Sequence, residues 1–314
     1  MNRSIKARNC LRQSSLLLLT TLLCAGRAYG APQGELDATF GENGRLVIQV
    51  AGGQFGRAIL QQPADGKLLF PGYSNRSDGG NDFAVLRLDS DGTVDGTFGM
   101  NGTATVDFGS ADAVATRLAV QSDNKILVAG SAGGVLALTR LNSHGAIDST
   151  FGSNGLVTVD LGGVADSLSD ITLLANGQFI VLGTTYANGS GDAVFARFGA
   201  NGVLDTTFGT GPVAGVTIIG VNGKNDELNA MIRQADGKLV ACGTTVHIDN
   251  GVDYSSDMLA VRVNADGSAD GSFGSNGVSQ IDDPASHSNA QTCAVMRDGS
   301  LMLAGFRGEP GSIK

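Results

Sequence analysis

The chain has 314 residues, of which 42% are hydrophobic, with 47 glycines, no tryptophan and a formal net charge of -9. An acidic chain repels nucleic acid and anionic lipid and attracts cations or basic partners, so we expect no nucleic-acid partner. Four cysteines in 314 residues are too few for a scaffold built on disulfides.

The first 30 residues predict an export signal. Residues 1–14 carry four basic side chains and no acid, residues 15–25 are mostly Leu, and residues 28–30 place small residues before a cleavage point. This pattern is typical of a secretory signal peptide, and its apolar run is too short for a membrane anchor. Cleavage after Gly30 is favoured over lipidation at Cys24 and would change the formal charge to -14. We therefore expect an exported protein, periplasmic or extracellular, with no membrane span.

A repeated tripeptide dominates the rest of the chain. Thr-Phe-Gly, or Ser-Phe-Gly in the last copy, is centred on Phe40, Phe98, Phe151, Phe208 and Phe273. A turn follows each phenylalanine at a distance that is constant in four of the units, and a short apolar run then ends in glycine. An arginine precedes the next phenylalanine at a fixed distance, whereas the gap between the glycine and this arginine changes from unit to unit. Fixed spacing within a regular repeat predicts stacked units with one variable loop each.

Each unit contains four short stretches that read as strands. In the second unit they cover residues 115–121, 126–131, 135–142 and 156–160. Helical periodicity is absent after the signal. Four strands in every repeat are typical of a β-propeller blade, whereas one coil of a β-helix is shorter. We therefore expect residues 31–314 to form a single all-β domain, a β-propeller of about five blades, with four complete four-stranded blades and an incomplete fifth.

Two of the repeated motifs resemble a known family. The stretch from Asn264 to Gly274, NADGSADGSFG, and the stretch from Ala235 to Gly243, ADGKLVACG, are similar to the delta-60 repeat of secreted bacterial proteins. The likeness covers essentially everything after residue 34. It implies a β-propeller, and it implies no settled activity, because the family is recognised by its repeat and not by a catalytic motif.

The last unit lacks part of its sheet. It supplies only residues 289–296 and 301–306, and the arginine of its third strand would fall beyond Lys314. We expect residues 45–50 to complete this fifth sheet as a closing N-terminal strand, the usual way to avoid an open edge. Either the blade has three strands or the chain is truncated, and truncation is favoured because no other unit omits that strand.

The variable loops predict where a ligand would bind. In a propeller, the loop between the second and third strands lies on the same edge as the link between blades, where repeat proteins usually bind partners. Three acids just before inner strands could share a cation such as Ca2+ at the channel mouth, although solvated surface acids are the alternative. These acids are Asp112, Asp166 and Asp226. The binding-loop candidates are Asp78, His247, Asp249 and Asp253.

Other motifs have structural interpretations. The stretch from Asp89 to Asp95 has the spacing of a calcium loop, but its equivalents lose ligands, and a turn capped by an Asx side chain explains every copy. Cys242 and Cys293 are expected to be buried small side chains, in preference to a disulfide. The repeated arginines need partners, and we expect acids of the fixed turns in the same or an adjacent blade. These arginines are Arg87, Arg140, Arg197 and Arg262.

Catalytic motifs do not appear in the sequence. The three histidines have no Cys, Glu or His at metal-ligand spacing, and neither a Gly-x-Ser-x-Gly elbow nor a phosphate loop is present. We therefore favour an exported non-enzymatic binding or scaffold β-propeller that presents its variable loop face to a protein or glycan, with no catalytic or cofactor-binding residue assigned. The alternative is a calcium-dependent hydrolase of the lactonase kind, or a sugar dehydrogenase, with its site at the acidic channel mouth.

Overall fold

The computed structural model describes residues 34–48, 52–109, 112–163, 166–221, 223–249, 252–281 and 287–308. The signal peptide predicted for residues 1–30 lies outside these ranges. The chain divides into two units, one ending at Arg45 and the other starting at Leu46. The described part of the first unit consists of turns, in which the Gly44 amide donates to the Phe40 carbonyl at 2.9 Å. None of the described helical segments is long and apolar enough to cross a membrane.

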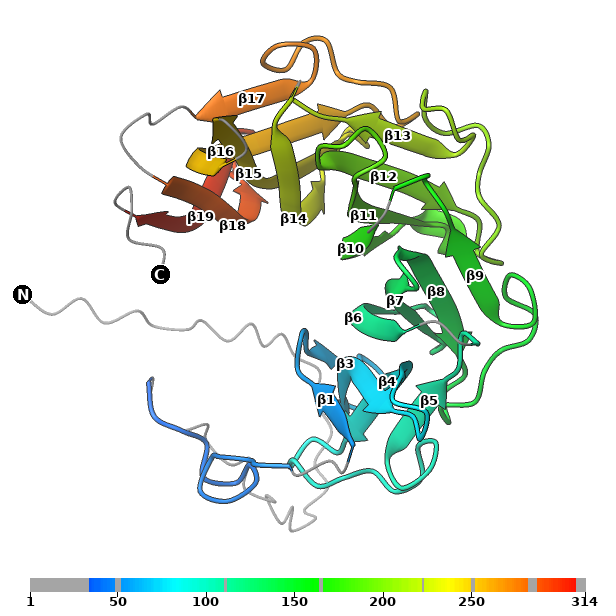
Figure 1. Ribbon diagram of the computed structural model, residues 1–314. Coiled ribbons are helices and arrows are strands. Elements are labelled where there is room, and N and C mark those ends of the chain that lie inside the picture. The colour runs from blue at the N-terminus through cyan, green and yellow to red at the C-terminus, as the bar shows by residue number, and fades with distance from the viewer. Residues whose placement is uncertain are drawn as a thin grey trace, which may run out of the picture. The chain divides into compact units, whose positions relative to one another are not determined.

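The second unit is built from antiparallel strands that form successive sheets (Figure 1). The first sheet contains β1 (Gly53–Phe55), β2 (Leu60–Gln61), β3 (Leu68–Asn75), β4 (Asn81–Leu88) and β5 (Thr103–Val106). The second contains β6 (Ala113–Val120), β7 (Ile126–Ala132), β8 (Val135–Leu141) and β9 (Leu156–Val159). The third contains β10 (Ser167–Leu173), β11 (Phe179–Thr185), β12 (Asp192–Phe198) and β13 (Val216–Ile219). The fourth contains β14 (Asn225–Arg233), β15 (Leu239–Asp249), β16 (Val252–Val263) and β17 (Val278–Ile281).

The second and third sheets each follow chain order, every strand pairing with the next one along the sequence. The four strands predicted for the second unit are confirmed. In the first sheet β1 and β2 both pair with β3, so they form one interrupted inner strand. The only helical element among the described residues is a 3-10 turn, η1 (Ala175–Gly177), and the all-β prediction is therefore confirmed.

The fifth unit contributes a hairpin of β18 (His287–Val295) and β19 (Leu301–Gly308). This hairpin joins the fourth sheet through one parallel pair, Ser256 with His287, which gives a continuous sheet of six strands. Residues 46–48 are not in a strand, and residues 49–51 lie outside the described ranges. The closing strand expected from residues 45–50 therefore stays a prediction.

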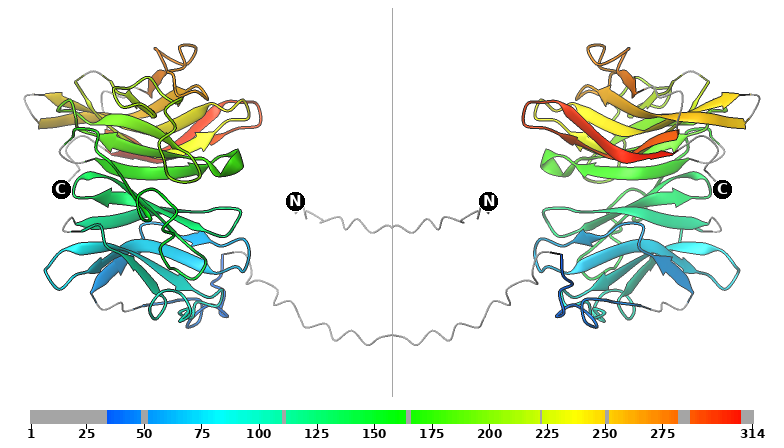
Figure 2. Two further views of the ribbon diagram at one scale, coloured as in Figure 1. Left: turned by 90° about the vertical axis from the view of Figure 1, so that its right-hand side faces the viewer. Right: turned by 90° about the vertical axis from the view of Figure 1, so that its left-hand side faces the viewer.

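Each sheet packs face to face on the next, which Figure 2 shows from the side. The inner strands of the later sheets are in contact, from β6 through β10 and β14 to β18, and β6 also contacts β3, the second strand of the first sheet. The repeated phenylalanine is part of these cores, and Phe98, Phe151 and Phe208 are fully buried. Cys242 on β15 and Cys293 on β18 pack together between the last two sheets as buried free thiols, so the expectation of small buried side chains is confirmed.

A bulge in the inner strand explains the glycine that ends each apolar run. The register of β6 shifts by one residue between Ala115 and Arg117, opposite Gly130 on β7. A Cβ atom at Gly130 would collide with the carbonyl oxygen of Val114. The same collision would occur at Gly183 with Ser167 and at Gly243 with Glu227. Only glycine lets the second strand approach the bulged backbone this closely.

Candidate functional site

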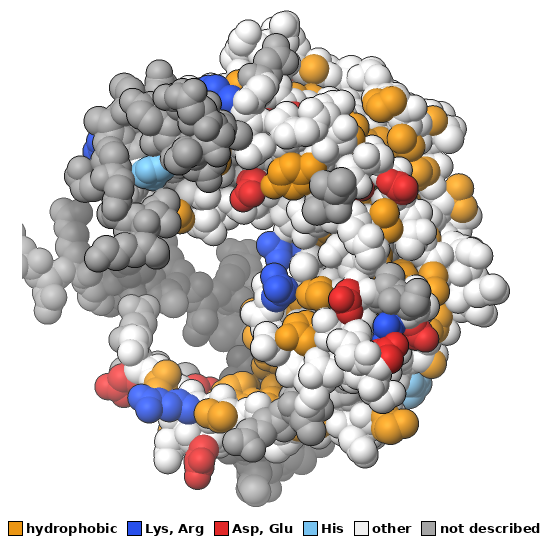
Figure 3. All heavy atoms as spheres, in the orientation of Figure 1, with side chains coloured by type: hydrophobic (Ala, Val, Ile, Leu, Met, Phe, Trp, Pro, Cys, Tyr) orange, Lys and Arg blue, Asp and Glu red, His pale blue; other side chains and the backbone are white. Residues whose placement is uncertain are grey.

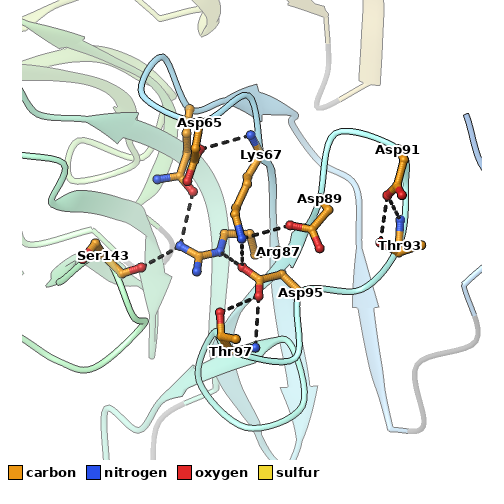
Figure 4. Close-up of polar contacts among 10 residues, drawn as sticks. Asp65, Lys67, Arg87, Asp89, Asp91, Thr93, Asp95, Thr97 and Ser143 are labelled. Carbon is orange, nitrogen blue, oxygen red and sulfur yellow. Dashed lines mark hydrogen bonds and ion pairs between the residues drawn. The ribbon is translucent and has the colours of Figure 1, made fainter. Parts of the chain in front are cut away.

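One edge of the sheets carries a repeated network around a buried carboxylate (Figure 4). Asp95 accepts hydrogen bonds on Oδ2 from Arg87 Nε and Lys67 Nζ, both at 2.7 Å. Its Oδ1 accepts from the Thr97 amide at 3.0 Å and from the Thr97 hydroxyl at 2.6 Å. Burial raises the pKa of Asp95, but the hydrogen bonds from Lys67, Thr97 and Arg87 outweigh it and hold the pKa well below its usual range. This edge is called the constant edge below.

The network recurs in the next three units. The corresponding Nε–Oδ2 distances are 2.8 Å for Arg140–Asp148, 2.9 Å for Arg197–Asp205 and 2.6 Å for Arg262–Asp270. Each guanidinium also lies over the phenylalanine of its unit, with 4.3 to 5.0 Å between the guanidinium carbon and the ring centroid. The predicted pairing of the repeated arginines is confirmed, and the partner belongs to the same unit.

These arginines also join neighbouring sheets. Arg87 Nη1 donates to the Ser143 carbonyl of the second unit at 2.6 Å. Arg140 and Arg197 make the equivalent bonds to the carbonyls of Ala200 and Ala265, at 2.5 and 3.0 Å. Because the network satisfies its own charged groups and connects sheets, the constant edge is structural.

The calcium-like stretch on this edge is a turn. The Asp91 carboxylate accepts from the Thr93 amide at 2.9 Å and from its hydroxyl at 2.7 Å, while Asp89 pairs with Lys67 at 2.9 Å. The Asx-turn interpretation of this stretch is confirmed.

The opposite edge, called the variable edge, contains the loops between second and third strands and the links from outer to inner strands. The two kinds of loop meet at each junction between sheets. The Asp166 amide donates to the Gly134 carbonyl at 2.7 Å, and the Asp226 amide donates to the Gly191 carbonyl at 2.7 Å. At the first junction, the Asn81 amide donates to Asp112 Oδ1 at 2.9 Å. The predicted grouping of these loops on one edge is therefore confirmed.

Carboxylates and threonines alternate across the third and fourth sheets at this edge. In the fourth sheet Asp226 stands opposite Thr245, which in turn stands opposite Asp257. In the third sheet Thr185 stands opposite Asp192, and a Cβ atom at Gly163 would lie 2.7 Å from Asp166 Oδ1 and 3.0 Å from Thr185 Oγ1. Side chains opposite one another share a face of the sheet. Each sheet therefore holds a row of oxygen atoms.

Asp226 is the most buried of the inner-strand acids, with 0% of its surface exposed. Its Oδ2 accepts a hydrogen bond from the Val221 amide, while Oδ1 has no hydrogen-bond partner among the described residues. Burial is the main reason that the pKa of Asp226 is raised to about 6; the Thr245 hydroxyl and the Val221 amide act in the opposite direction, and the charge of Asp192 raises it further. A buried carboxylate oxygen without a donor is costly.

Asp192 faces this carboxylate from the third sheet. The two side chains approach the same point, because a Cβ atom at Gly220 would lie 3.2 Å from Asp226 Oδ2 and would collide with Asp192 Oδ1. Burial also raises the pKa of Asp192. Gly220 and Val221 line a cavity of about 600 Å³ between β13 and β17, which also borders Gln280. Asp192 and Asp226 therefore form an oxygen-rich cluster beside an accessible cavity.

The structure separates the three acids that sequence spacing placed together. Asp166 and Asp226 are 2% and 0% exposed and lie two residues before the bulge-forming leucines Leu168 and Leu228. Asp112 lies three residues before the equivalent Ala115 and is exposed. Because side chains alternate along a strand, this difference of one position puts Asp112 out of step with Asp166 and Asp226. The matching position in the second sheet is Ala113. Figure 3 shows one face of the molecule, on which acidic side chains lie at several separate places, some of them beside basic side chains.

The binding-loop candidates occupy different kinds of position. Asp78 lies in the turn between β3 and β4, where it accepts from Arg76 Nε and from the Gly80 amide, both at 3.0 Å. The loop interpretation is wrong for His247, Asp249 and Asp253, which belong to strands β15 and β16. The extra length of this unit extends its hairpin, with strands of 11 and 12 residues against 7 to 8 in the other sheets.

No group of three or more His, Cys, Asp or Glu side chains suited to a metal occurs in the part of the chain that the structure describes. A cation at the variable edge would therefore rest on two carboxylates together with hydroxyl, carbonyl or water oxygens. Sequence spacing identified Asp226 but missed Thr245 and Asp192 as its neighbours. The signal in the sequence for these neighbours was an aspartate or a threonine at the end of each adjacent strand that lies on the variable edge.

Comparison with solved structures gives matches of low similarity. One is titled as a crystal structure of glucose dehydrogenase, with 13% identity and a TM-score of 0.41, covering 80% of this chain and 79% of the other. Another is titled as a streptogramin B lyase structure, with 14% identity and a TM-score of 0.35, covering 84% and 86%. No curated protein sequence matches this chain.

A family model does match. The family is described as a domain of unknown function (DUF5122) beta-propeller, and the matched segments are residues 64–98, 121–151, 174–208 and 234–273. Each segment runs from a fixed turn through the second and third strands to the repeated phenylalanine, so the match covers the parts that build the constant edge. These four matches, with the all-β sheets and their repeated network, support a β-propeller repeat fold for this chain.

Proposed function

We propose that the repeats form five blades, with β18 and β19 as the start of the fifth. The parallel pair between Ser256 and His287 supports this count. Ser256 precedes Asp257 of the third strand β16, and His287 begins the next inner strand, β18. The third and fourth sheets make the equivalent contact, in which the Asp226 amide donates to the carbonyl of Gly191, the residue before Asp192 of β12. The six-stranded sheet is then one blade plus the first hairpin of the next.

We propose that the protein is an exported, non-enzymatic binding module that holds a hard divalent cation, such as Ca2+, at its variable edge. The observation that carries this proposal is the fully buried Asp226, whose Oδ1 has no hydrogen-bond partner among the described residues while Asp192 lies beside it. A cation would neutralise both carboxylates and would accept the free oxygen as a ligand. The delta-60 resemblance and the predicted signal peptide support export.

The donor atoms fit a hard cation better than a transition metal. Asp192, Asp226 and Thr245 offer oxygen atoms only, and Ca2+ takes six to eight oxygen ligands at flexible geometry. Water entering from the neighbouring cavity would supply the remaining ligands. Few protein ligands predict weak binding, with Kd on the order of 10⁻⁴ to 10⁻³ M, in the range of extracellular calcium modules. Lys224 favours the ionised form of Asp226 and would compete with the cation.

A calcium titration of the thermal melting temperature tests this proposal. We expect millimolar Ca2+ to stabilise the chain by about 1–3 kcal/mol over NaCl at matched ionic strength, because a ligand that binds only the folded state adds its binding free energy. Asp226→Asn should abolish this shift whatever its effect on the baseline stability. Asp112→Asn is the matched control, since it removes the charge of an exposed acid at another junction and should leave the calcium shift unchanged.

The calcium proposal fails if the parent chain shows no calcium shift, or if Asp226→Asn retains it. A direct readout accompanies the melting experiment. Isothermal titration calorimetry should report one binding event in the parent and none in Asp226→Asn, with circular dichroism confirming that the variant is folded.

A macromolecular ligand is a second candidate function, favoured by the extended hairpin of β15 and β16. Length variation concentrates at the variable edge, and this hairpin is the longest there. We propose that it contacts a protein or a glycan. Replacing residues 247–254 by a two-glycine turn like that of Gly133 and Gly134 should abolish any binding seen on a glycan array and leave the melting temperature nearly unchanged. Retained glycan binding would exclude the hairpin, and an array without any signal would count against glycans as the ligand.

A further inference from the structure

The first and last sheets of the second unit expose apolar side chains at positions that are buried in the other sheets. Met302 on β19 is 51% exposed, and Ile59, just before β2, is 61% exposed. Single apolar residues on a surface need no explanation. These two differ because the repeat shows what each position normally contacts.

Met302 occupies a position that packs on the following sheet. It lies three residues before Gly305, and the equivalent residues lie three before their own glycines. Those residues, Leu69, Leu127, Ile180 and Val240, are between 0% and 2% exposed. Leu69, Leu127 and Ile180 belong to the cores that join their own sheet to the next one in the chain. Each sheet has a following face, which packs on the next sheet in the chain, and a preceding face, which packs on the sheet before it. Met302 lies on the following face of the fifth sheet, where no described sheet packs.

Ile59 occupies the complementary position, which packs on the preceding sheet. Its neighbour Leu60 pairs with Leu69, so Ile59 stands at the inner-strand position opposite Phe70. The equivalent residues are Leu118, Ile171, Met231 and Cys293. Leu118, Met231 and Cys293 are 5% to 8% exposed, and each belongs to the core shared with the sheet before it. Ile59 lies on the preceding face of the first sheet, which no described sheet covers.

We propose that a second copy of this chain occupies these faces, with the fifth sheet of one copy packing on the first sheet of another. The two faces are complementary by construction, because every internal junction joins a following face to a preceding face. Pairing two identical faces would not reproduce that contact. The interface is thus heterologous, so a single pair of copies leaves one free face at each end.

Sedimentation velocity on the full chain tests the proposal, because the two faces can be blocked separately. We expect the parent to form larger species as concentration rises. Met302→Glu blocks the following face and Ile59→Glu blocks the preceding face, and each variant alone should sediment as a monomer. An equal mixture should give a dimer and nothing larger. The intact following face of Ile59→Glu can pack on the intact preceding face of Met302→Glu, and the two remaining faces are blocked.

Controls separate this arrangement from nonspecific association. Met100 is 80% exposed on a turn of the constant edge, so Met100→Glu should assemble like the parent. Circular dichroism should show unchanged strand content in all three variants. A parent that stays monomeric up to high concentration overturns the proposal. So does a mixture that stays monomeric, or a dimer formed by Ile59→Glu or Met302→Glu alone, which would indicate identical faces pairing.

Discussion

At the scale of the residue, the repeated arginine has three roles at once. Arg140 binds Asp148 and Thr150 in its own unit, covers the ring of Phe151, and donates to the Ala200 carbonyl of the next unit. A planar guanidinium serves several acceptors in a fixed geometry and stacks on an aromatic ring, whereas the ammonium of a lysine is a point charge on a flexible stem. This explains why arginine recurs at a fixed distance from the phenylalanine in four units.

Replacing one of these arginines should destabilise the fold. Arg140→Met keeps much of the apolar stem but leaves the partly buried Asp148 with fewer donors, so we expect a loss of about 1–3 kcal/mol in the free energy of unfolding. Urea unfolding measures the change. Lys125 also contacts Asp148, at 3.0 Å, but its side chain is 34% exposed, so Lys125→Met should cost less than about 1 kcal/mol. Equal losses in the two variants would contradict the assigned role of Arg140.

The sequence predicted the constant edge better than the variable edge. Fixed spacing placed Arg140 near an acid and assigned Asp91 to an Asx turn, because both depend on contacts between residues that are close along the chain. Asp226 and Asp192 come from different units, and their approach depends on how two sheets pack. Spacing along the sequence also grouped Asp112 with the buried acids. Asp112 is shifted by one position along the strand, and because side chains of a strand alternate between its two faces, it does not share their position.

At the scale of the element, a bulge and a glycine form a matched pair in the second, third and fourth sheets. The spacing of the glycine was visible in the sequence, but its cause was not, because the carbonyl that it accommodates belongs to another strand. The long hairpin shows a second limit of sequence interpretation. His247, Asp249 and Asp253 were expected to lie in a loop, yet residues 246–249 and 252–257 continue the ladder of β15 and β16. The sequence alone does not mark how far two strands extend along a hairpin.

Adding one methyl group at the glycine tests the bulge. Gly130→Ala would place a Cβ atom against the Val114 carbonyl of β6, so we expect a loss of roughly 1–3 kcal/mol, as for other overpacked positions. At Gly96 an added Cβ atom would meet nothing within 4 Å, and Gly96→Ala should be neutral or slightly stabilising. The change in urea midpoint compares the two. A neutral Gly130→Ala would mean that the inner strand can move away.

At the scale of the whole molecule, the constant edge predicts sensitivity to acid. Asp95 and Asp148 have pKa values held below the ordinary value of 3.8, since hydrogen bonds to Lys, Thr and Arg outweigh the opposing effect of burial. A carboxylate with a lowered pKa in the folded state contributes stability above its unfolded pKa and loses it as the pH falls. Because the network recurs along the chain, these losses should add.

We therefore expect the urea midpoint to fall steeply once the pH drops below about 4, where carboxylates of the unfolded chain take up protons. Asp148→Asn should be less stable than the parent at pH 7 and should lose less stability between pH 5 and pH 3. Urea titrations across that range measure both effects. Parallel pH profiles for the parent and Asp148→Asn would show that this carboxylate does not contribute to the acid response.

The bonds that tie one sheet to the next end on main-chain carbonyls, those of Ser143, Ala200 and Ala265. Every residue type supplies such a carbonyl, so the receiving unit can change its sequence at this turn without breaking the connection. A unit therefore behaves as an exchangeable cassette: gene duplication or recombination can insert, remove or swap it, and the new neighbours need no compensating mutation at that contact. The array can lengthen or diversify its variable loops while keeping the same joint between units.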